Sequence, residues 1–209
     1  MSEPRMVSVK TMRDSDAYTI KNLVPSKELM RRAGEAIFKA GKWKEPVAIV
    51  CGKGNNAGDG YVVARYMKDN GIECTIVLLS DAFSEDGEFY YKEAVSVGVP
   101  VVKLEDAGGL KGFESVLDCI LGTGFAGTVK EPYATAIKMI NDRGREGAYI
   151  VSADINSGLN GDTGLGELYV VSDLTVSIGE FKYGHFRGVS EKAMEDKVNC
   201  DIGIVIVEE

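Results

Sequence analysis

The 209-residue sequence predicts an α/β fold, a three-layer α/β/α sandwich built around a mostly parallel sheet. Seven apolar runs of strand length recur along the chain, at residues 46–51, 73–79, 99–104, 115–121, 148–155, 173–178 and 201–207. The runs are continuous rather than alternating, which is typical of strands buried on both faces. Segments with a helical spacing of apolar residues separate them. This alternation favours parallel pairing through right-handed crossovers, and hence three layers.

The first 40 residues contain two helical patterns, around residues 11–22 and 26–39, ahead of the first strand. We expect them to form a helical extension, residues 1–40, that packs on the sandwich. A chain of this length can bury one sizeable core but not two ordinary large ones. The sequence therefore predicts a single domain over residues 1–209.

Three more helices are expected between the strands. Apolar residues recur at spacings of three and four within residues 62–71, which end in an Asn-Gly pair suited to a helix C-cap. Residues 84–98 are acidic at their start, as the helix dipole favours. Pro132 opens the last pattern, because proline is preorganised for a first helical turn, and Ile137 and Ile140 follow on one face.

Composition and charge argue against several function classes. A formal net charge of −8 disfavours nonspecific nucleic-acid binding, which needs a basic surface. No apolar run is long enough for a signal peptide or a membrane span, so we expect no membrane association and a cytoplasmic location. No Cys-x-x-Cys pair occurs, which indicates buried reduced thiols at Cys51, Cys74, Cys119 and Cys200.

The stretch CGKGNNAGDG, residues 51–60, directly follows the first predicted strand, where parallel sheets bind ligands. It fits the dinucleotide fingerprint GxGxxA only formally, because Gly58 and Gly60 would each cost about 1 kcal/mol inside a helix. No acidic residue nearer than Asp81 follows the second strand, and no Gly-Lys-Ser/Thr marks a P-loop. We therefore expect Asp59 to cap the next helix and the preceding glycines to form a concave binding loop, with an unliganded turn as the alternative.

Two further strands end in polar residues. Asp118 lies inside an apolar run, where a carboxylate costs desolvation unless a cation or a set of N–H donors offsets it. A purely structural, hydrogen-bonded aspartate is the alternative. Asp154 and Ser157 follow the strand at 148–155. Three polar strand ends on one rim of the sheet predict a ligand site there.

These segments resemble a known family. GNNAGDG, VLDCILGTGFAG, SADINSG, SDLTVSIGEFKYGH and DIGI, in this order and with MRDSDAYTIKN and LMRRAG before them, are similar to the YjeF N-terminal domain, the NAD(P)H-hydrate (NAD(P)HX) epimerase family. The resemblance covers nearly the whole chain. It implies a Rossmann-like sandwich that interconverts the R and S forms of NADHX and NADPHX, so that a separate dehydratase can restore the cofactor. It also implies a leaning to homodimers; a fused dehydratase domain is not expected.

The resemblance further implies roles for matching positions. The implied substrate-binding residues are Asn55, Asn56, Ala57, Gly58, Asp59, Gly122, Thr123, Gly124, Phe125, Ala126, Gly127, Thr128 and Asp154. The implied ligands of a potassium ion, K+, are Asn56, Asp118 and Ser157. Lys182 matches a lysine near the site, with an ordinary solvated lysine as the alternative.

Inverting a hydroxylated ring carbon requires breaking a bond to it, either by loss and return of water or by opening and closing the ring. Both routes need a group that gives and takes a proton. Asp154 is the predicted acid/base residue, because it lies at a strand end within reach of a ligand on the glycine loop. Lys182 is the predicted assisting group. His185, the single histidine, receives no chemical role on spacing alone.

Three departures from the family pattern bear on activity. Ala57 replaces a glycine, a small change unless its φ is positive. Asn156 replaces a proline, which would loosen the turn that holds Ser157. Arg31 and Arg32 replace a glutamate and an asparagine; if that asparagine lines the pocket, Arg32 would alter or block substrate binding.

Two other functions stay open at this point. The same fold resembles the C-terminal domain of eukaryotic mRNA-decapping scaffolds, which suggests a noncatalytic nucleotide- or RNA-binding and dimerisation module. The acidic charge argues against RNA. A dinucleotide dehydrogenase is the second alternative, which neither the glycine loop nor the missing ribose-binding acid supports.

Overall fold

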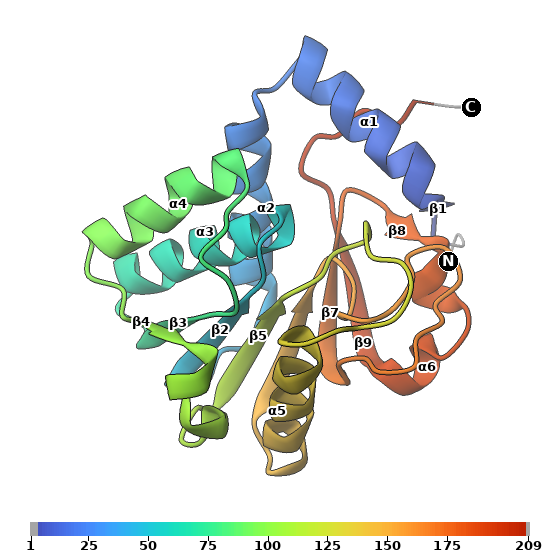
Figure 1. Cartoon of the computed structure of the whole chain (residues 1–209). Coiled ribbons are helices and arrows are strands. Elements are labelled where there is room, and N and C mark those ends of the chain that lie inside the picture. The colour runs from blue at the N-terminus through green and yellow to red at the C-terminus, as the bar shows by residue number, and fades with distance from the viewer. Residues whose placement is uncertain (1–3, 208–209) are drawn as a thin grey trace.

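The computed structural model describes residues 4–207 and confirms the predicted sandwich (Figure 1). A seven-stranded sheet has the order β4-β3-β2-β5-β6-β7-β9, and every pairing in it is parallel. Its strands are β2 (Val47–Cys51), β3 (Cys74–Leu78), β4 (Val101–Lys103), β5 (Ser115–Cys119), β6 (Tyr149–Ala153), β7 (Ser172–Ile178) and β9 (Met194–Cys200). Two short strands, β1 (Met6–Val7) and β8 (Phe181–Lys182), pair in parallel beside the sheet.

The strand order reverses between β2 and β5. The chain runs outward from β2 through β3 to β4, then returns to place β5 on the other side of β2. Such a switch point opens a crevice at the carboxyl ends of the two central strands, where ligands bind in open α/β sheets. The glycine turn after β2 and the glycine-rich segment after β5 both lie at this position.

Helices cover both faces of the sheet (Figure 1). The helices are α1 (Val9–Asn22), α2 (Ser26–Ala40), α3 (Asn55–Asp69), α4 (Glu85–Ser96), α5 (Tyr133–Arg145) and α6 (Ser190–Ala193), with 3-10 turns η1 (Leu104–Asp106), η2 (Gly108–Leu110) and η3 (Tyr183–Phe186). Successive residues of β2 enter opposite cores. Ile49 belongs to the core that includes residues of α2, α3 and α4, and Val50 belongs to the core that includes residues of α5. No helix within residues 4–207 is long and apolar enough to cross a membrane.

Helix α3 begins at Asn55, with Gly54 as its N-cap, so the prediction that Asp59 caps this helix is wrong. Gly58 and Gly60 lie inside this helix. At both positions α3 packs so closely on its neighbours that no side chain would fit. A Cβ on Gly58 would lie 2.5 Å from Sδ of Met30, and one on Gly60 would lie 2.9 Å from Sγ of Cys119. The close packing of α3 on α2 and on the sheet offsets the poor helix propensity of these glycines.

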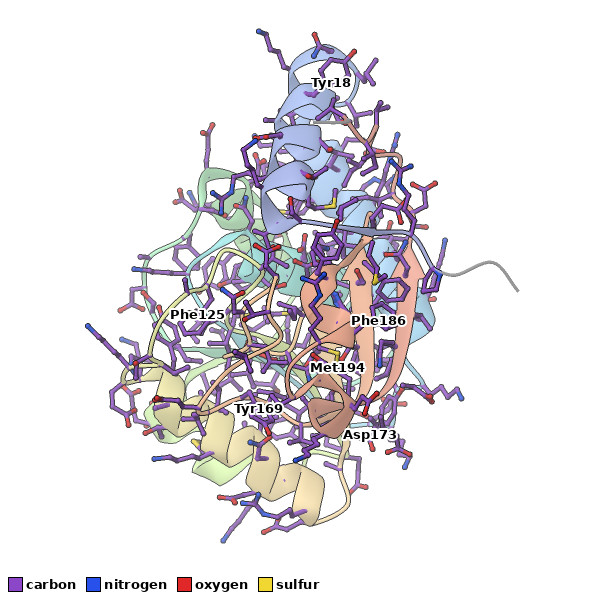
Figure 2. All side chains as sticks on the ribbon, turned by 90° about the vertical axis from the view of Figure 1, so that its right-hand side faces the viewer. Tyr18, Phe125, Tyr169, Asp173, Phe186 and Met194 are labelled. Atoms are coloured by element: carbon purple, nitrogen blue, oxygen red, sulfur yellow. The ribbon has the colours of Figure 1, made fainter. Side chains whose placement is uncertain are left out.

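The apolar run at 201–207 is not a strand, contrary to expectation; the last strand is the more polar β9. Residues 201–207 instead run along α1. The N–H of Val205 donates to Oγ1 of Thr19, and the N–H of Val207 donates to Oγ of Ser15, both at 3.0 Å. These bonds tie the C-terminal segment to α1, which spans above the sheet. Tyr18, near the C-terminal end of α1, is exposed (Figure 2).

Candidate active site

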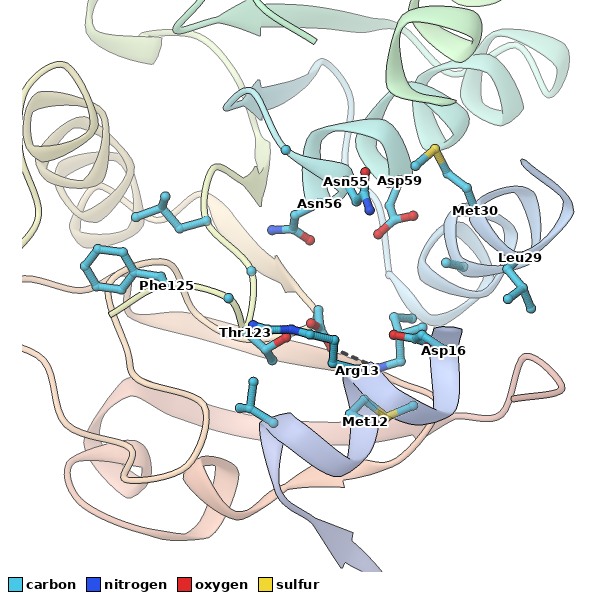
Figure 3. Close-up of a pocket in the computed structure, with 18 of the residues that line it drawn as sticks. Met12, Arg13, Asp16, Leu29, Met30, Asn55, Asn56, Asp59, Thr123 and Phe125 are labelled. Carbon is cyan, nitrogen blue, oxygen red and sulfur yellow. Dashed lines mark hydrogen bonds between the residues drawn. The ribbon is translucent and has the colours of Figure 1, made fainter. Parts of the chain in front are cut away.

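A cavity of about 680 Å³ lies at the carboxyl ends of the central strands. Its walls come from α1 and α2, the start of α3, the segment after β5, and the ends of β6 and β7 (Figure 3). This is the crevice that the reversal of strand order opens. The volume is within the range of small-molecule sites, roughly 300–1,000 Å³.

Most of the predicted substrate residues line this cavity. They are Asn55, Asn56, Asp59, Gly122, Thr123, Gly124, Phe125, Ala126 and Asp154, and Lys182 lines it as well. Four predicted residues do not line it. Ala57 and Gly58 are buried in α3 behind the wall, whereas Gly127 and Thr128 are exposed farther along their loop. Ala57 has no positive φ, so this departure from glycine is accommodated.

Asp154 and Lys182 form a buried ion pair at the base of the cavity. The Lys182 side chain is 1% exposed, and its Nζ also donates to the carbonyl of Ile178 at 2.8 Å. Lys182 is thus no solvated lysine. Burial raises the pKa of Asp154, but the adjacent ammonium more than offsets this and holds that pKa below its ordinary value. Asp154 is therefore an anion at neutral pH.

The backbone of Asp154 has φ of +62°, a left-handed conformation that costs a non-glycine residue about 1–3 kcal/mol. Several hydrogen bonds hold it there. Its N–H donates to the carbonyl of Val176 at 2.8 Å, and its carbonyl accepts from Nε2 of His185 at 2.8 Å. Such strain concentrates at functional sites.

His185 is a buried residue that positions Asp154. The N–H of Lys182 donates to Nδ1 at 3.1 Å, which leaves the proton of the neutral ring on Nε2, facing the Asp154 carbonyl. Burial and the Lys182 charge lower the pKa of His185 to about 4. The histidine is neutral and internally satisfied, which agrees with giving it no chemical role.

Asp118 is fully buried and accepts four hydrogen bonds. Its Oδ1 accepts from Oγ of Ser157 at 2.5 Å and from the N–H of Ile120 at 3.2 Å; its Oδ2 accepts from the N–H of Ser157 at 2.9 Å and from Oγ of Ser152 at 3.0 Å. A carboxylate has about four lone-pair positions. Four protein donors thus satisfy the Asp118 carboxyl group, although burial still raises its pKa above the ordinary value.

Asn56 is a buried polar residue of this region whose side chain has no protein partner among the described residues. Its side chain is 8% exposed, it lines the cavity, and within residues 4–207 neither Oδ1 nor Nδ2 has a hydrogen bond. A buried amide without a partner costs about 1–3 kcal/mol. Asn56 is therefore positioned for a ligand atom or an ion.

Asn156 tightens the turn that carries Ser157 rather than loosening it, contrary to expectation. Its Nδ2 donates to the carbonyl of Val170, Oγ of Ser172 and the carbonyl of Ala193 at 2.8–2.9 Å. Its Oδ1 accepts from Oγ1 of Thr175 at 2.6 Å. The buried amide connects three segments of the chain, which a proline at this position would not do.

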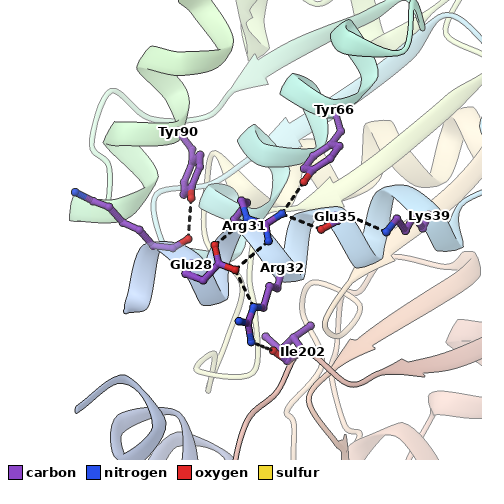
Figure 4. A network of polar contacts seen from close by, with 9 residues as sticks. Glu28, Arg31, Arg32, Glu35, Lys39, Tyr66, Tyr90 and Ile202 are labelled. Atoms are coloured by element: carbon purple, nitrogen blue, oxygen red, sulfur yellow. Dashed lines mark hydrogen bonds and ion pairs between the residues drawn. The ribbon is translucent and has the colours of Figure 1, made fainter. Parts of the chain in front are cut away.

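Arg31 and Arg32 lie outside the cavity wall (Figure 4). Arg31 binds Glu28, Glu35 and the hydroxyl of Tyr66 at 2.8–2.9 Å. Arg32 binds Glu28 at 2.9 Å and the carbonyl of Ile202 at 3.1 Å. Helical phase turns both guanidinium groups away from the cavity, so the condition under which Arg32 would alter or block substrate binding is not met.

Sequence reasoning missed the contribution of α1, which we expected only to pack on the sandwich. Val9, Arg13, Asp16 and Ile20 all line the cavity. Their spacings of four, three and four residues place them along one face of a helix. On this face Arg13 and Asp16 lie between the apolar residues Val9 and Ile20. Two charged residues on an otherwise apolar helix face are a sequence signal that could have indicated a contribution to the site.

Two more carboxyl groups of the cavity are perturbed. Burial raises the pKa of Asp16 to about 6; Lys182 opposes the shift and Asp154 adds to it. Burial, then the charges of Asp154 and Asp16, raise the pKa of Asp59 well above its ordinary value. The site thus combines one ionised carboxylate with two carboxyl groups that retain a proton more readily, an arrangement suited to proton transfer.

Comparisons with known proteins identify relatives of this chain. The model of a protein family described as YjeF-related protein N-terminus matches residues 26–184. The NAD(P)H-hydrate epimerase of Limosilactobacillus reuteri is 32% identical over 166 residues, 77% of each chain. That of Limosilactobacillus fermentum is 32% identical over 184 residues, 85% of this chain and 87% of the relative.

A longer relative and a solved structure also match. The bifunctional NAD(P)H-hydrate repair enzyme Nnr of Coxiella burnetii is 34% identical over 161 residues, 74% of this chain but 32% of that enzyme. This chain thus matches about a third of the length of such bifunctional relatives. The crystal structure of yeast ynu0, YNL200c, superposes with a TM-score of 0.75 at 24% identity, covering 91% of this chain and 86% of that one, and shows the shared fold.

Proposed function

This chain belongs to the family of YjeF-related N-terminal domains, and we propose that it is an epimerase that interconverts the R and S forms of hydrated NADH and NADPH. The observation that carries the proposal is the Asp154–Lys182 ion pair at the base of a cavity at the sheet's switch point. It brings a proton-transferring group to the place where a nucleotide would bind.

The cavity suits a nicotinamide nucleotide. Helix α3 points its first turn at the cavity, and its N-cap Gly54 offers no side-chain acceptor to the helix N–H groups. Such N–H groups, with the helix dipole, favour phosphate. Lys53 and Arg13 line the same cavity and add positive charge. These features support binding of the diphosphate despite the net negative charge of the chain.

Asp154 is the proposed acid/base residue. Epimerisation by loss and return of water develops positive charge on the nicotinamide ring. A carboxylate that Lys182 keeps ionised would stabilise that charge and accept a proton from the entering water. Lys182 fixes the carboxylate in place, and His185 fixes the backbone that carries it.

A potassium ion is a further proposal, with Asn56, Asp118 and Ser157 as its ligands. The unpartnered amide oxygen of Asn56 fits a hard cation, and the buried charge of Asp118 would balance it. The Ser157 hydroxyl, which now donates to Asp118, would offer its oxygen to the ion instead. When bound, potassium would supply positive charge beside the substrate.

Partners and location are proposals as well. The bifunctional relatives are named NAD(P)H-hydrate repair enzymes, which supports coupling to a second repair activity. The partner in this proposal is a separate NAD(P)HX dehydratase, which would consume the S form. A cytoplasmic location and a homodimer complete the proposal. The dimer would appear as twice the mass of 22.5 kDa in light scattering.

The function is tested by following the ratio of R to S forms of NADHX and NADPHX by chromatography, with the spontaneous rate subtracted. The wild-type protein should restore the equilibrium ratio after one form is depleted. Asp154→Asn should lower the catalysed rate by about 10²–10⁴-fold while keeping the fold. An unchanged rate in this variant would remove Asp154 from the mechanism, and an inactive wild-type protein would refute the function.

A further inference from the structure

Asp16, on the inner face of α1, is a cavity carboxyl group that the chemistry of Asp154 leaves unused. It is half-buried, and within residues 4–207 no hydrogen bond or ion pair engages its side chain. Figure 3 shows Asp16 directed from α1 into the same space that Asp59 enters from α3. The carboxyl group of Asp16 is therefore free to contact a ligand.

A second observation marks the same space as a ligand site. The Asn56 amide faces the cavity, is more than nine-tenths buried and has no partner among the described residues. Charged side chains of both signs surround it. Besides Asp16, the charged residues that line the cavity are Arg13, Lys53, Asp59, Asp86, Asp154 and Lys182.

Inversion of a ring carbon through loss of water has a geometric requirement. The hydroxyl group leaves from one face of the ring and water enters on the other, so proton transfer is needed on both faces. Asp154 extends from the end of β6, in the sheet, whereas Asp16 extends from α1, which spans above the sheet. The two carboxyl groups approach the cavity from different walls.

We propose that Asp16 is a second catalytic residue, which exchanges a proton with the hydroxyl oxygen on one face of the nicotinamide ring while Asp154 does so on the other. This inference rests on the proposed epimerase function. Asp16 donates its proton to the hydroxyl oxygen, the C–O bond breaks, and its electron pair leaves with water. The lone pair of the ring nitrogen forms the iminium bond.

The return of water completes the reaction. A water oxygen forms a new C–O bond on the opposite face, the iminium electrons return to nitrogen, and Asp154 accepts the proton. The reverse reaction uses the same groups in the opposite order. No oxidant or reductant takes part, and one water leaves for each that enters. Proton exchange with solvent returns Asp16 to its protonated form and Asp154 to its ionised form before the next turnover in the same direction.

The pKa values of the two carboxyl groups differ in the direction that a proton donor and a proton acceptor require. Burial raises the pKa of Asp16 to about 6, whereas Lys182 holds the pKa of Asp154 below its ordinary value. The active form has Asp16 protonated and Asp154 ionised. Because Asp16 loses its proton as pH rises, the catalysed kcat/KM should fall with increasing pH through about 6, toward tenfold per unit at higher pH.

The test compares the wild-type protein with Asp16→Asn, Asp16→Glu and Asp14→Asn, using NADHX between pH 5 and pH 8. Asp14→Asn is a matched control, because it removes the same charge from the same helix at an exposed position paired with Lys10. Asp16→Asn should lower kcat/KM by about 10²–10⁴-fold, and its residual rate should lack the decline through pH 6. Asp16→Glu should keep measurable activity with the decline, and Asp14→Asn should match the wild type.

Unfolding temperatures of all four proteins separate a lost proton donor from a lost fold. An active wild-type protein with an equally active Asp16→Asn variant would overturn the role of Asp16 and leave the epimerase function standing. An unchanged decline through pH 6 in the residual rate of Asp16→Asn would also overturn it. A wild-type protein without epimerase activity would overturn both.

Discussion

Replacing Lys182 by methionine removes the partner of Asp154 while preserving most of the apolar stem. The lysine is 1% exposed, so the change leaves a buried carboxylate without its counter-charge. Removing one member of a buried ion pair costs about 3–5 kcal/mol of unfolding free energy. For a domain of this size we expect the unfolding temperature to fall by roughly 6–20 °C, at about 2–4 °C per kcal/mol.

The loss should depend on pH, with a defined sign. In the wild type the pKa of Asp154 is depressed, so its contribution to stability is present above the unfolded pKa and declines only in strong acid. In Lys182→Met, burial acts unopposed and raises that pKa. The variant then loses stability as pH rises through the raised pKa, so its deficit relative to the wild type should be larger at pH 8 than at pH 5.

Urea unfolding followed by circular dichroism at pH 5 and pH 8 measures this difference. Lys192→Met, an exposed position on α6, is the control and should change stability by less than about 0.5 kcal/mol. Adding Asp154→Asn to Lys182→Met should restore part of the loss at pH 8. A deficit below about 1 kcal/mol, or one equal at both pH values, would refute the energetic role assigned to the pair.

Three further predictions concern stability and ion binding. Gly60→Ala should destabilise the protein by about 1–3 kcal/mol in urea unfolding, because a Cβ meets Cys119 Sγ at 2.9 Å. A Cβ on Gly54 meets open space, so Gly54→Ala should cost at most about 1 kcal/mol, the difference between glycine and alanine at an N-cap; a larger loss in Gly54→Ala than in Gly60→Ala would contradict the packing role. Asn156→Pro should lower unfolding free energy by about 2–4 kcal/mol, because four donors and acceptors lose their partner, and a more stable variant would show that the family's proline is compatible with this turn. Potassium should raise the unfolding temperature above its value in equal sodium, and Asn56→Ala should abolish that difference; an equal rise in the variant would exclude Asn56 as a ligand.

The sequence predicted the sheet and the position of the site because both rest on strong local patterns. Continuous apolar runs identified six strands of the seven-stranded sheet, and polar residues within or just after these runs singled out Asp118 and Asp154. The start of α3 was mispredicted because the propensity of Gly58 and Gly60 was considered without the close packing that requires them. Strand β9 was missed because an edge strand paired only with β7 has little need of apolar residues.

The unpredicted parts of the site depend on tertiary placement. Asp16 contributes because α1 crosses the strand ends, which no local pattern specifies. Arg31 and Arg32 stay out of the cavity because of helical phase. Leu29, Met30 and Ala33 face the cavity, whereas both arginines bind Glu28. Hydrogen-bond partners of His185 and Asn156 lie on segments distant in sequence. The spacing of residues along the chain therefore could not predict that these two buried side chains are fully hydrogen-bonded.

The hydrogen bonds of Asn156 and His185 have a consequence for the order in which the site is assembled. The turn at residues 154–157 is held by groups at 170–175, 182–185 and 193, all of which leave the ribosome later. The nascent chain can build the central strands and the glycine turn well before Asp154 is fixed. A chain cut near residue 180 would retain most of the cavity wall but neither the ammonium nor the imidazole that orients Asp154.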